Sequence, residues 1–203
     1  MLRSTFLVLL LGAGISVACP VRHADPDPHL RVHVYDFVGL STTELDFAEV
    51  ESSRLLHPAV PVTWINCHAV GDQPCGQEFR AGDLAVRVLP HAPATLGRNI
   101  LGVATVADQG VYAAILYDRV RALRSYGLPS GSALGRVMAH EITHLLLGPG
   151  SHASIGVMRP NWSVRDFRID STSLWFYTAK QQAAMHAQLA CRASATGDLR
   201  KPE

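Results

Sequence analysis

Alternating apolar and polar residues predict five β-strands along the chain. Residues 30–37 alternate between the two kinds, which is the period of a half-buried strand. Apolar runs of strand length follow at residues 60–65, 84–89, 100–106 and 111–117. The last two runs flank Ala107-Asp108-Gln109-Gly110, whose turn-like composition predicts that these strands form an antiparallel pair.

Helical spacing of apolar residues, with residues that begin and end helices, predicts four helices. They cover residues 42–57, 118–126, 130–147 and 179–191. Ser41 or Thr42 can cap the first helix and Thr178 the last, because a side-chain oxygen there accepts from a first-turn backbone N–H. The third helix opens near Ser130 or Ser132. The order of elements indicates an α+β domain with a mixed, roughly five-stranded sheet.

Length and composition favour one folded domain. The chain has 203 residues, of which 48% are hydrophobic and 17% are charged, a balance that supports a single hydrophobic core. A second full domain does not fit. We expect a signal peptide at residues 1–18, an extended leader at 19–29, the domain at 30–195 and a polar tail at 196–203.

The N-terminus has the pattern of a secretory signal peptide. Arg3 supplies a positive charge, residues 6–11 form an apolar run, and small residues Ser16 and Ala18 come before Cys19. We therefore expect a secreted or periplasmic protein. Cleavage after Ala18 leaves either a plain secretory terminus or a lipid anchor on Cys19. No later segment has the roughly eighteen uninterrupted apolar residues of a membrane helix, so we expect no integral membrane span.

The cysteines predict at least one disulfide. Cys19, Cys67, Cys75 and Cys191 allow three pairings in an oxidising compartment. We favour Cys67–Cys75, because this pair closes a short loop between two predicted strands. Cys19 is then left for a lipid or for pairing with Cys191.

The charge balance argues against two classes of partner. Residues 1–18 contain Arg3 and no acidic residue, so their removal changes 18 basic and 17 acidic residues to 17 of each. A neutral chain has no electrostatic reason to bind nucleic acid or an anionic membrane surface.

The candidate chemistry lies in the third predicted helix, where His140-Glu141-Ile142-Thr143-His144 is the H-E-x-x-H pattern. Residues four apart lie one helical turn above each other, so both imidazoles can reach one ion. A neighbouring apolar stripe can be buried while the histidines face a cleft. It consists of Leu134, Met138, Ile142 and Leu145. We therefore predict that His140 and His144 bind a metal ion.

Zinc is the expected ion, since neutral imidazoles suit a borderline-soft cation and a catalytic zinc takes three protein ligands and a water. His152 is the leading candidate for the third ligand, because Gly148-Pro149-Gly150 allows the chain to reverse after the helix. Asp166 and Asp170 are the alternatives, as a later carboxylate can also complete a zinc site.

Glu141 is the predicted general base. It lies next to the first ligand and about a quarter turn away on the helix, which directs its carboxylate toward a water on the ion. Zinc lowers the pKa of such a water to about 7, so the carboxylate can take its proton while the ion polarises a scissile carbonyl. These parts predict an endopeptidase that acts on peptides or proteins. The alternative is a secreted or envelope-associated protein that uses zinc for stability or to hold a partner, without turnover.

Residues 140–152, followed by Gly156-Val157-Met158, resemble the metzincin clan of zinc peptidases. In that clan a Gly ends the active-site helix, a third His follows, and a Met lies in a tight turn beneath the metal. The resemblance implies a zincin-like fold with an active-site helix and a C-terminal helix. It assigns the helix-ending turn to Gly148 and the supporting Met to Met158. Residues 112–120 and 140–162 also resemble a family of secreted bacterial proteins.

Two positions depart from the common metzincin pattern. In that pattern the Gly comes three residues after the second His and the third His three residues later, whereas both gaps are four here. His152 therefore comes two residues late. Thr143 also stands where many relatives have Gly.

The resemblance also has implications for substrate binding. It implies that the strand at residues 100–106 pairs with an extended substrate through backbone hydrogen bonds. Large aromatic side chains in a small domain belong to the core more often than to a pocket. The resemblance implies that residues after Met158 wall the pocket that reads the substrate side chain, with Trp162, Trp175 and Phe176 as possible wall residues; we favour a core role for these three.

Overall fold

The structure is a computed structural model that describes residues 28–57, 59–68, 75, 78–107, 110–167 and 173–197. The expected signal peptide, nearly all of the expected leader, and Asp170 lie outside the described residues. None of the described helices has the length and hydropathy that a bilayer-spanning helix requires.

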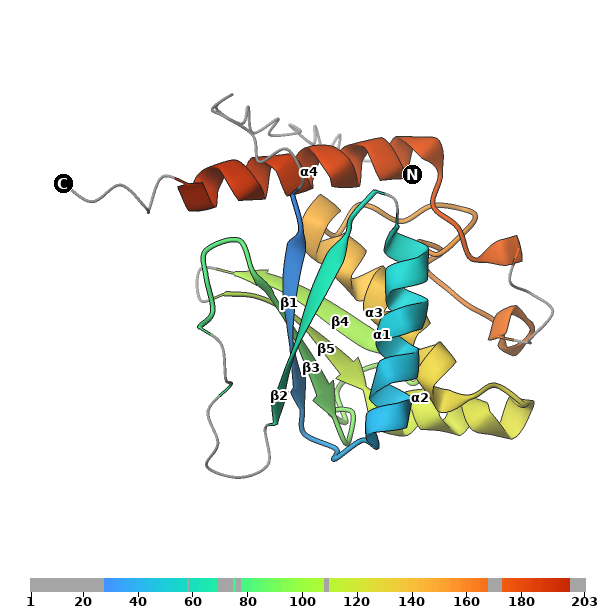
Figure 1. The fold of residues 1–203 in the computed structure, drawn as a ribbon. Helices are drawn as coiled ribbons and strands as arrows, with labels where there is room; N and C mark the ends of the chain where they lie inside the picture. The colour runs from blue at the N-terminus through green and yellow to red at the C-terminus, as the bar shows by residue number, and fades with distance from the viewer. Residues whose placement is uncertain are drawn as a thin grey trace, which may run out of the picture.

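A five-stranded mixed sheet forms the centre of the domain, in the order β2-β1-β3-β5-β4 (Figure 1). Four strands run parallel, and β4 is an antiparallel edge strand that pairs with β5. The α+β class, the mixed sheet and the antiparallel pair are confirmed. The strands are β1 Leu30–Asp36, β2 Val62–His68, β3 Leu84–Leu89, β4 Gly102–Ala107 and β5 Gly110–Leu116.

The second strand differs from its prediction. It was expected at residues 60–65 and forms at Val62–His68, because its parallel register with β1 runs from Leu30↔Val62 to Asp36↔His68. The pairing therefore extends the strand through Cys67, beyond the apolar run that the sequence pattern shows.

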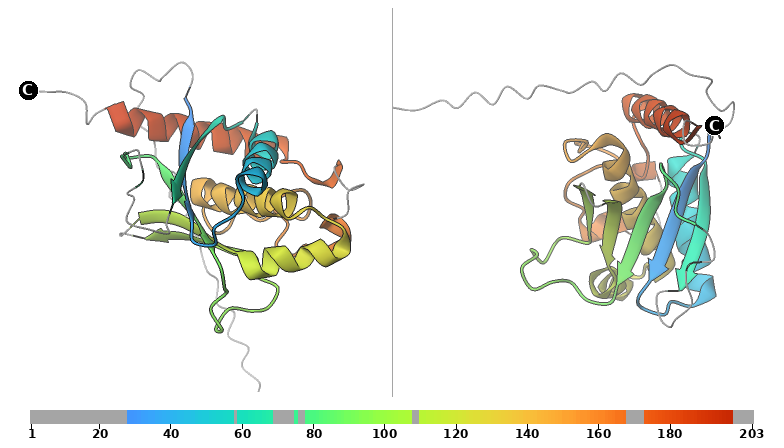
Figure 2. Two further views of the ribbon diagram at one scale, coloured as in Figure 1. Left: turned by 60° about the horizontal axis from the view of Figure 1, so that its bottom comes forward. Right: turned by 90° about the vertical axis from the view of Figure 1, so that its left-hand side faces the viewer.

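Within the described residues, four α-helices and short 3₁₀ segments accompany the sheet. Helices α1 and α3 lie side by side on one face of the sheet, and α4 crosses one end of it (Figures 1 and 2). The elements are α1 Thr42–Leu56, α2 Tyr117–Ala122, η1 Leu123–Tyr126, α3 Ser130–Leu147, η2 Val164–Phe167 and α4 Ala179–Gly197.

Local capping explains where two helices begin. Ser41 Oγ accepts from the Glu44 backbone N–H at 3.2 Å at the start of α1. At α4, Thr178 Oγ1 accepts from the Gln181 backbone N–H at 3.3 Å, while Gln181 Oε1 accepts from the Thr178 N–H at 3.0 Å. This second arrangement is a reciprocal capping box. Both predicted caps are confirmed.

The last helix is longer than predicted. It continues to Gly197 rather than ending at Cys191, so the first two residues of the expected polar tail are helical. The Arg192 guanidinium donates to the Leu145 carbonyl near the C-terminal end of α3, at 3.1 Å. That tertiary contact holds the additional turns against the domain.

Close packing of α1 against α3 depends on two glycines of α3. A Cβ built at Gly131 would lie 2.8 Å from the Glu44 carbonyl oxygen, and one at Gly135 would collide with the Ala48 carbonyl oxygen. Arg136 extends the same contact, with its Nε 3.0 Å from Glu51 Oε1. The two helix backbones therefore approach more closely than a Cβ permits.

The predicted disulfide Cys67–Cys75 is confirmed and links β2 to the segment before β3. It is compatible with a location outside the cytoplasm, where disulfides persist. Cys191 is not a free thiol either. Cys19, to which the lipid and pairing alternatives refer, lies outside the described residues.

The helix contact gives a stability prediction for Gly135→Ala. Alanine is the better helix former by about 1 kcal/mol, but here its methyl group meets the α1 backbone, which cannot move aside as a side chain can. We expect Gly135→Ala to destabilise the domain by about 1–3 kcal/mol, measured as a lower urea midpoint. Ser132→Ala, half-buried on the same helix, is the control and should stay within about 0.5 kcal/mol of the parent. Equal midpoints for the two variants would contradict the packing argument.

Candidate metal centre

Helix α3 presents its two motif histidines to a cleft because its other faces are buried. The predicted apolar stripe is almost completely inaccessible to solvent, which fixes the rotation of the helix about its axis. The exposed fractions are 0% for Leu134, Met138 and Ile142 and 3% for Leu145. His140 and His144 lie one turn apart beside this stripe and keep 8% exposure each.

Three imidazole nitrogens converge at this point. His144 Nε2 lies 3.0 Å from His140 Nε2 and 3.0 Å from His152 Nε2. The structure thus brings together the three histidines that the sequence singled out, and it places them as a group that could hold a metal ion.

The second nitrogen of each helix histidine is occupied, which determines what faces the centre. His140 Nδ1 lies 2.8 Å from the Val157 carbonyl oxygen, so it donates its proton there. His144 Nδ1 lies 3.2 Å from the Gly148 carbonyl and 2.9 Å from Ser151 Oγ, whose own hydroxyl donates to that carbonyl. A neutral imidazole has one N–H, so both Nε2 atoms point lone pairs at the shared position. Converging lone pairs repel unless a cation lies between them.

Burial keeps the helix histidines neutral. It lowers the pKa of His140 to about 4, with smaller contributions in the same direction from His144 and His152, against the hydrogen bond to Val157. The pKa of His144 is also lowered, again mainly by burial. Both imidazoles therefore hold free lone pairs at neutral pH, the form in which histidine binds metals.

The turn after α3 brings His152 to the helix pair. Gly148 ends the helix at φ 84°, in the region that favours glycine, and its N–H donates to the His144 carbonyl at 2.8 Å. The Ala153 N–H, directly after His152, donates to the Met158 carbonyl at 2.8 Å. Relative to the metzincin spacing, one extra residue lies in the last turn of α3 and one between Gly148 and His152.

Asp166, the carboxylate alternative that lies within the described residues, does not join this group. Asp166 Oδ1 lies 2.8 Å from Arg159 Nη1, and its Oδ2 accepts from the Ser163 N–H at 2.6 Å. These contacts lower the pKa of Asp166 despite its partial burial. Its carboxylate is therefore committed to a local turn and an ion pair. Asp170 lies outside the described residues.

Met158 lies in a tight turn, as the resemblance implied. The Arg159 N–H donates to the Gly156 carbonyl at 3.4 Å, which closes a four-residue turn, and Met158 is fully buried. The preceding residue of the turn, Val157, supplies the carbonyl that binds His140. The turn is thereby attached directly to the first histidine.

Glu141 points toward the edge strand β4 and is 6% exposed. A Cβ at Gly102 would lie 2.7 to 3.0 Å from the Glu141 Cγ, Oε1 and Cδ atoms, so only glycine leaves room for the carboxylate. Burial raises the pKa of Glu141 to about 8, against a hydrogen bond from the Ala104 backbone that lowers it. A cation at the adjacent histidines would favour the charged form of this carboxylate.

A cleft of about 630 Å³ lies between β4 and the histidines. Its lining includes Glu141, all three histidines, the backbone of β4 and residues 159–162. Trp162 packs edge-on against His140, with 4.9 Å between ring centroids, and also against Trp175. The core assignment holds for Trp175, which is 4% exposed, but it is wrong for Phe176, which is 41% exposed.

Trp162 lines the cleft, as the resemblance allowed for residues after Met158, and it also packs against the core. It is half-buried, and its ring contacts both His140 and the aromatic cluster. Arg159 is a cleft residue that sequence reasoning did not name.

No protein-family model matches this chain, and no curated protein matches it either. Its chemistry is therefore inferred from the side chains of the cleft and from the motif that they carry.

The convergence of lone pairs gives a metal-binding prediction. We expect the folded chain to retain about one zinc per molecule after dialysis, measured by atomic emission, and His144→Ala to retain none. Zinc at about 100 times its dissociation constant should raise the free energy of unfolding by about 2.7 kcal/mol in the parent, but not in His144→Ala. His91→Ala, which removes an exposed histidine, is the matched control and should behave as the parent.

The third ligand has its own test. We expect His152→Ala to weaken zinc binding by about 100-fold or more, since loss of a ligand costs at least as much as loss of a supporting contact. Asp166→Asn should leave the affinity unchanged. A competitive titration with a chromogenic chelator measures both, and the reverse order would assign the third ligand to Asp166.

Proposed function

We propose that this protein is a secreted, metzincin-like zinc endopeptidase, with His140, His144 and His152 as ligands and Glu141 as general base. The observation that carries the proposal is the convergence of three Nε2 atoms beside a buried carboxylate in a cleft. The H-E-x-x-H motif on one helix and the Met158 turn support the same assignment.

The donor set fits zinc. Three neutral imidazoles are ligands of borderline softness, and three protein ligands are the number that a catalytic zinc takes. Val157 and Gly148 fix two of the rings through their Nδ1 atoms, which is the usual supporting arrangement for histidine ligands. When bound, zinc supplies a Lewis acid that polarises a carbonyl oxygen and makes water acidic enough to ionise near neutral pH.

Glu141 has the properties of the base. Its carboxylate lines the cleft with His140, and the burial of this side chain strengthens its electrostatic interactions with neighbouring groups. Oε1 or Oε2 can take a proton from water and later pass it to the leaving amine. Gly102 and Ala104 hold the side chain on the β4 side of the cleft.

Strand β4 is suited to bind an extended peptide. It pairs with β5 along one edge, and its other edge lines the cleft opposite the histidines. A peptide there would add a strand through backbone hydrogen bonds, which are largely indifferent to sequence. Its scissile carbonyl would then pass in front of the metal centre, so proteins and unfolded peptides are the proposed substrates.

The decisive experiment replaces the base and keeps the ligands. We expect Glu141→Gln to retain zinc and to lower the cleavage of a fluorogenic, denatured protein substrate by about 10² to 10⁴-fold. Asp46→Asn, which neutralises an exposed carboxylate on α1, is the control and should cleave as the parent. Full activity in Glu141→Gln would refute the mechanism.

A parent protein that cleaves none of the tested substrates would favour the second candidate function, that of a non-catalytic zinc-binding protein. If the parent binds zinc and is stabilised by it but cleaves neither denatured proteins nor peptide libraries, the protein is a non-catalytic zinc-binding or envelope-associated interaction protein. Zinc removal would then lower the melting temperature without any change in proteolysis.

Gly102 provides an independent check of the Glu141 position. Gly102→Ala places a methyl group within 3.0 Å of the Glu141 side chain, which must then move away. We expect cleavage to fall by about 10-fold or more, since small displacements of catalytic groups are costly, while zinc stoichiometry stays the same. Gly97→Ala is the matched control, because its added Cβ meets only Ile100 Cδ1 at 3.8 Å. Equal cleavage by the two variants would show that Glu141 does not need this space.

A further inference from the structure

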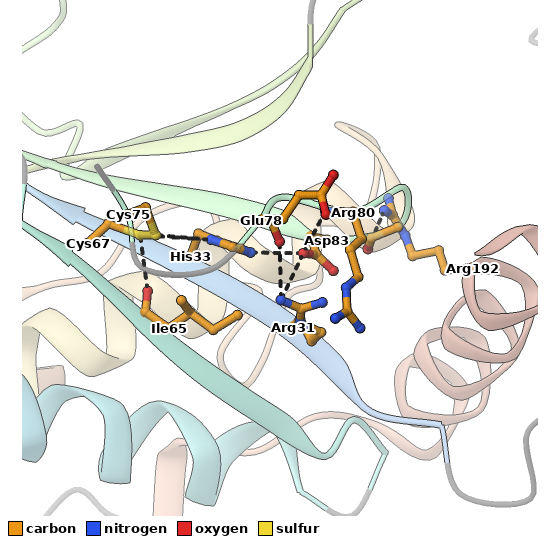
Figure 3. Close-up of polar contacts among 10 residues, drawn as sticks. Arg31, His33, Ile65, Cys67, Cys75, Glu78, Arg80, Asp83 and Arg192 are labelled. Carbon is orange, nitrogen blue, oxygen red and sulfur yellow. Dashed lines mark hydrogen bonds and ion pairs between the residues drawn. A yellow bond between two sulfur atoms is a disulfide. The ribbon is translucent and has the colours of Figure 1, made fainter. Parts of the chain in front are cut away.

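A second cluster of soft ligands lies on the other face of the sheet (Figure 3). His33 of β1 faces away from Val32 and Val34, which pack in the core beneath the helices, because side chains alternate along a strand. Its neighbours on that face are Cys67 of β2 and Cys75, and these three residues could hold a metal ion. We call them, with Asp83, the His33 cluster.

One nitrogen of His33 is bound by a carboxylate. His33 Nε2 lies 2.8 Å from Asp83 Oδ2, and His33 is fully buried. The same carboxylate oxygen accepts from the Arg80 N–H at 2.9 Å and lies 3.7 Å from the Arg31 guanidinium. A carboxylate oxygen that already accepts from a backbone N–H is an acceptor for the ring as well, so Nε2 donates a hydrogen bond to it. In the neutral ring Nδ1 then carries a lone pair.

That lone pair faces the two sulfurs. Nδ1 lies 3.5 Å from Cys75 Sγ and 3.8 Å from Cys67 Sγ. A disulfide has no proton to donate. In the oxidised state the Nδ1 lone pair of the neutral ring therefore faces two sulfur atoms that can only accept a hydrogen bond. Two thiols would each supply a donor, and two thiolates with the imidazole would supply a ligand set.

The nitrogen–sulfur distances already suit a tetrahedral ion. With zinc about 2.3 Å from sulfur and about 2.0 Å from nitrogen, tetrahedral angles require about 3.5 Å between the nitrogen and each sulfur. The observed separations of 3.5 Å to Cys75 and 3.8 Å to Cys67 lie close to that value. A carboxylate that accepts from the second ring nitrogen of a metal-binding histidine is also a recurrent arrangement in zinc sites.

We propose that the His33 cluster is a second, redox-gated cation site, which takes a thiophilic cation of the zinc type when the Cys67–Cys75 disulfide is reduced. Cys67 Sγ, Cys75 Sγ and His33 Nδ1 are the ligands, and Asp83 orients the imidazole through Nε2. This site shares no residue with the cleft and does not depend on the proposed function.

The chemistry balances with a dithiol as reductant. A thiolate of the dithiol attacks Cys75 Sγ, because Cys75 is half-buried whereas Cys67 is 3% exposed. The S–S bond breaks, Cys67 leaves as a thiolate beside His33, and the second thiol of the reductant releases Cys75. Two electrons and two protons pass to the cysteines, and the dithiol becomes a disulfide. Binding of the cation then releases the two thiol protons.

A bound cation would maintain the connection that the Cys67–Cys75 disulfide makes. The disulfide ties β2 to the segment before β3, and a cation held by both sulfurs ties the same two positions while adding β1 through His33. The two cysteines thus stay linked in either redox state, which limits the gain in chain entropy on reduction.

Cobalt(II) is the probe, because thiolate ligands give it near-ultraviolet charge-transfer absorption that imidazole ligands do not. The full mature chain is titrated anaerobically with Co²⁺, with and without a phosphine reductant. We expect the thiolate band only after reduction, saturating at one Co²⁺ per chain, while binding at the histidine centre adds no such band. The oxidised parent is the matched control, since it differs from the reduced protein only in the redox state of its cysteines.

Substitutions of Asp83 and His33, which leave both sulfurs in place, distinguish a preorganised metal site from two independent thiols. Asp83→Asn should weaken the reduced-state Co²⁺ affinity by about 10 to 100-fold, as loss of a supporting partner does, and His33→Asn should weaken it further. His57→Asn, which changes an exposed histidine, should have no effect. No thiolate band after reduction, or a band with the same affinity in Asp83→Asn and His33→Asn, would overturn the proposal.

Discussion

Three imidazole nitrogens that converge on one position are the constraint on which the candidate site depends. Neighbouring Nε2 atoms lie 3.0 Å apart, and His140 and His144 each have a carbonyl partner at Nδ1, so their two Nε2 lone pairs repel each other unless a cation lies between them. Val157 and Gly148 supply those carbonyls from the loop after α3. The loop, the helix and the three imidazoles therefore form one unit, whose electrostatic cost is offset only by positive charge.

The fold provides the rigidity that this unit requires. Buried residues on α3 prevent the helix from rotating, and Gly131 and Gly135 bring α1 close enough to support it. On the cleft side, β4 is held by β5 and leaves space for Glu141 at Gly102. Small residues at close contacts thus constrain where the carboxylate lies relative to the histidines.

The two histidine clusters use the same device with different partners. In each, an acceptor holds the N–H of one ring nitrogen and leaves a lone pair on the other, directed at neighbouring atoms. At the cleft the neighbours are nitrogens. At His33 they are the sulfurs of a disulfide, which can become ligands only when reduced. We therefore expect cation binding at the cleft in either redox state, and at the proposed second site only after reduction.

Sequence alone determined the local features. The His140 and His144 pair, Glu141 beside it, the Ser41 and Thr178 caps and most element bounds follow from spacing within one helix or strand, because backbone periodicity fixes which neighbours meet. Tertiary structure decided the rest. Asp166 is separated from the histidines by its own ion pair, α4 lengthens through Arg192, and Trp162 reaches His140. His33 meets Asp83 across 50 positions of chain. Such contacts depend on how sheet, helices and loops pack, and no periodicity in the chain encodes that packing.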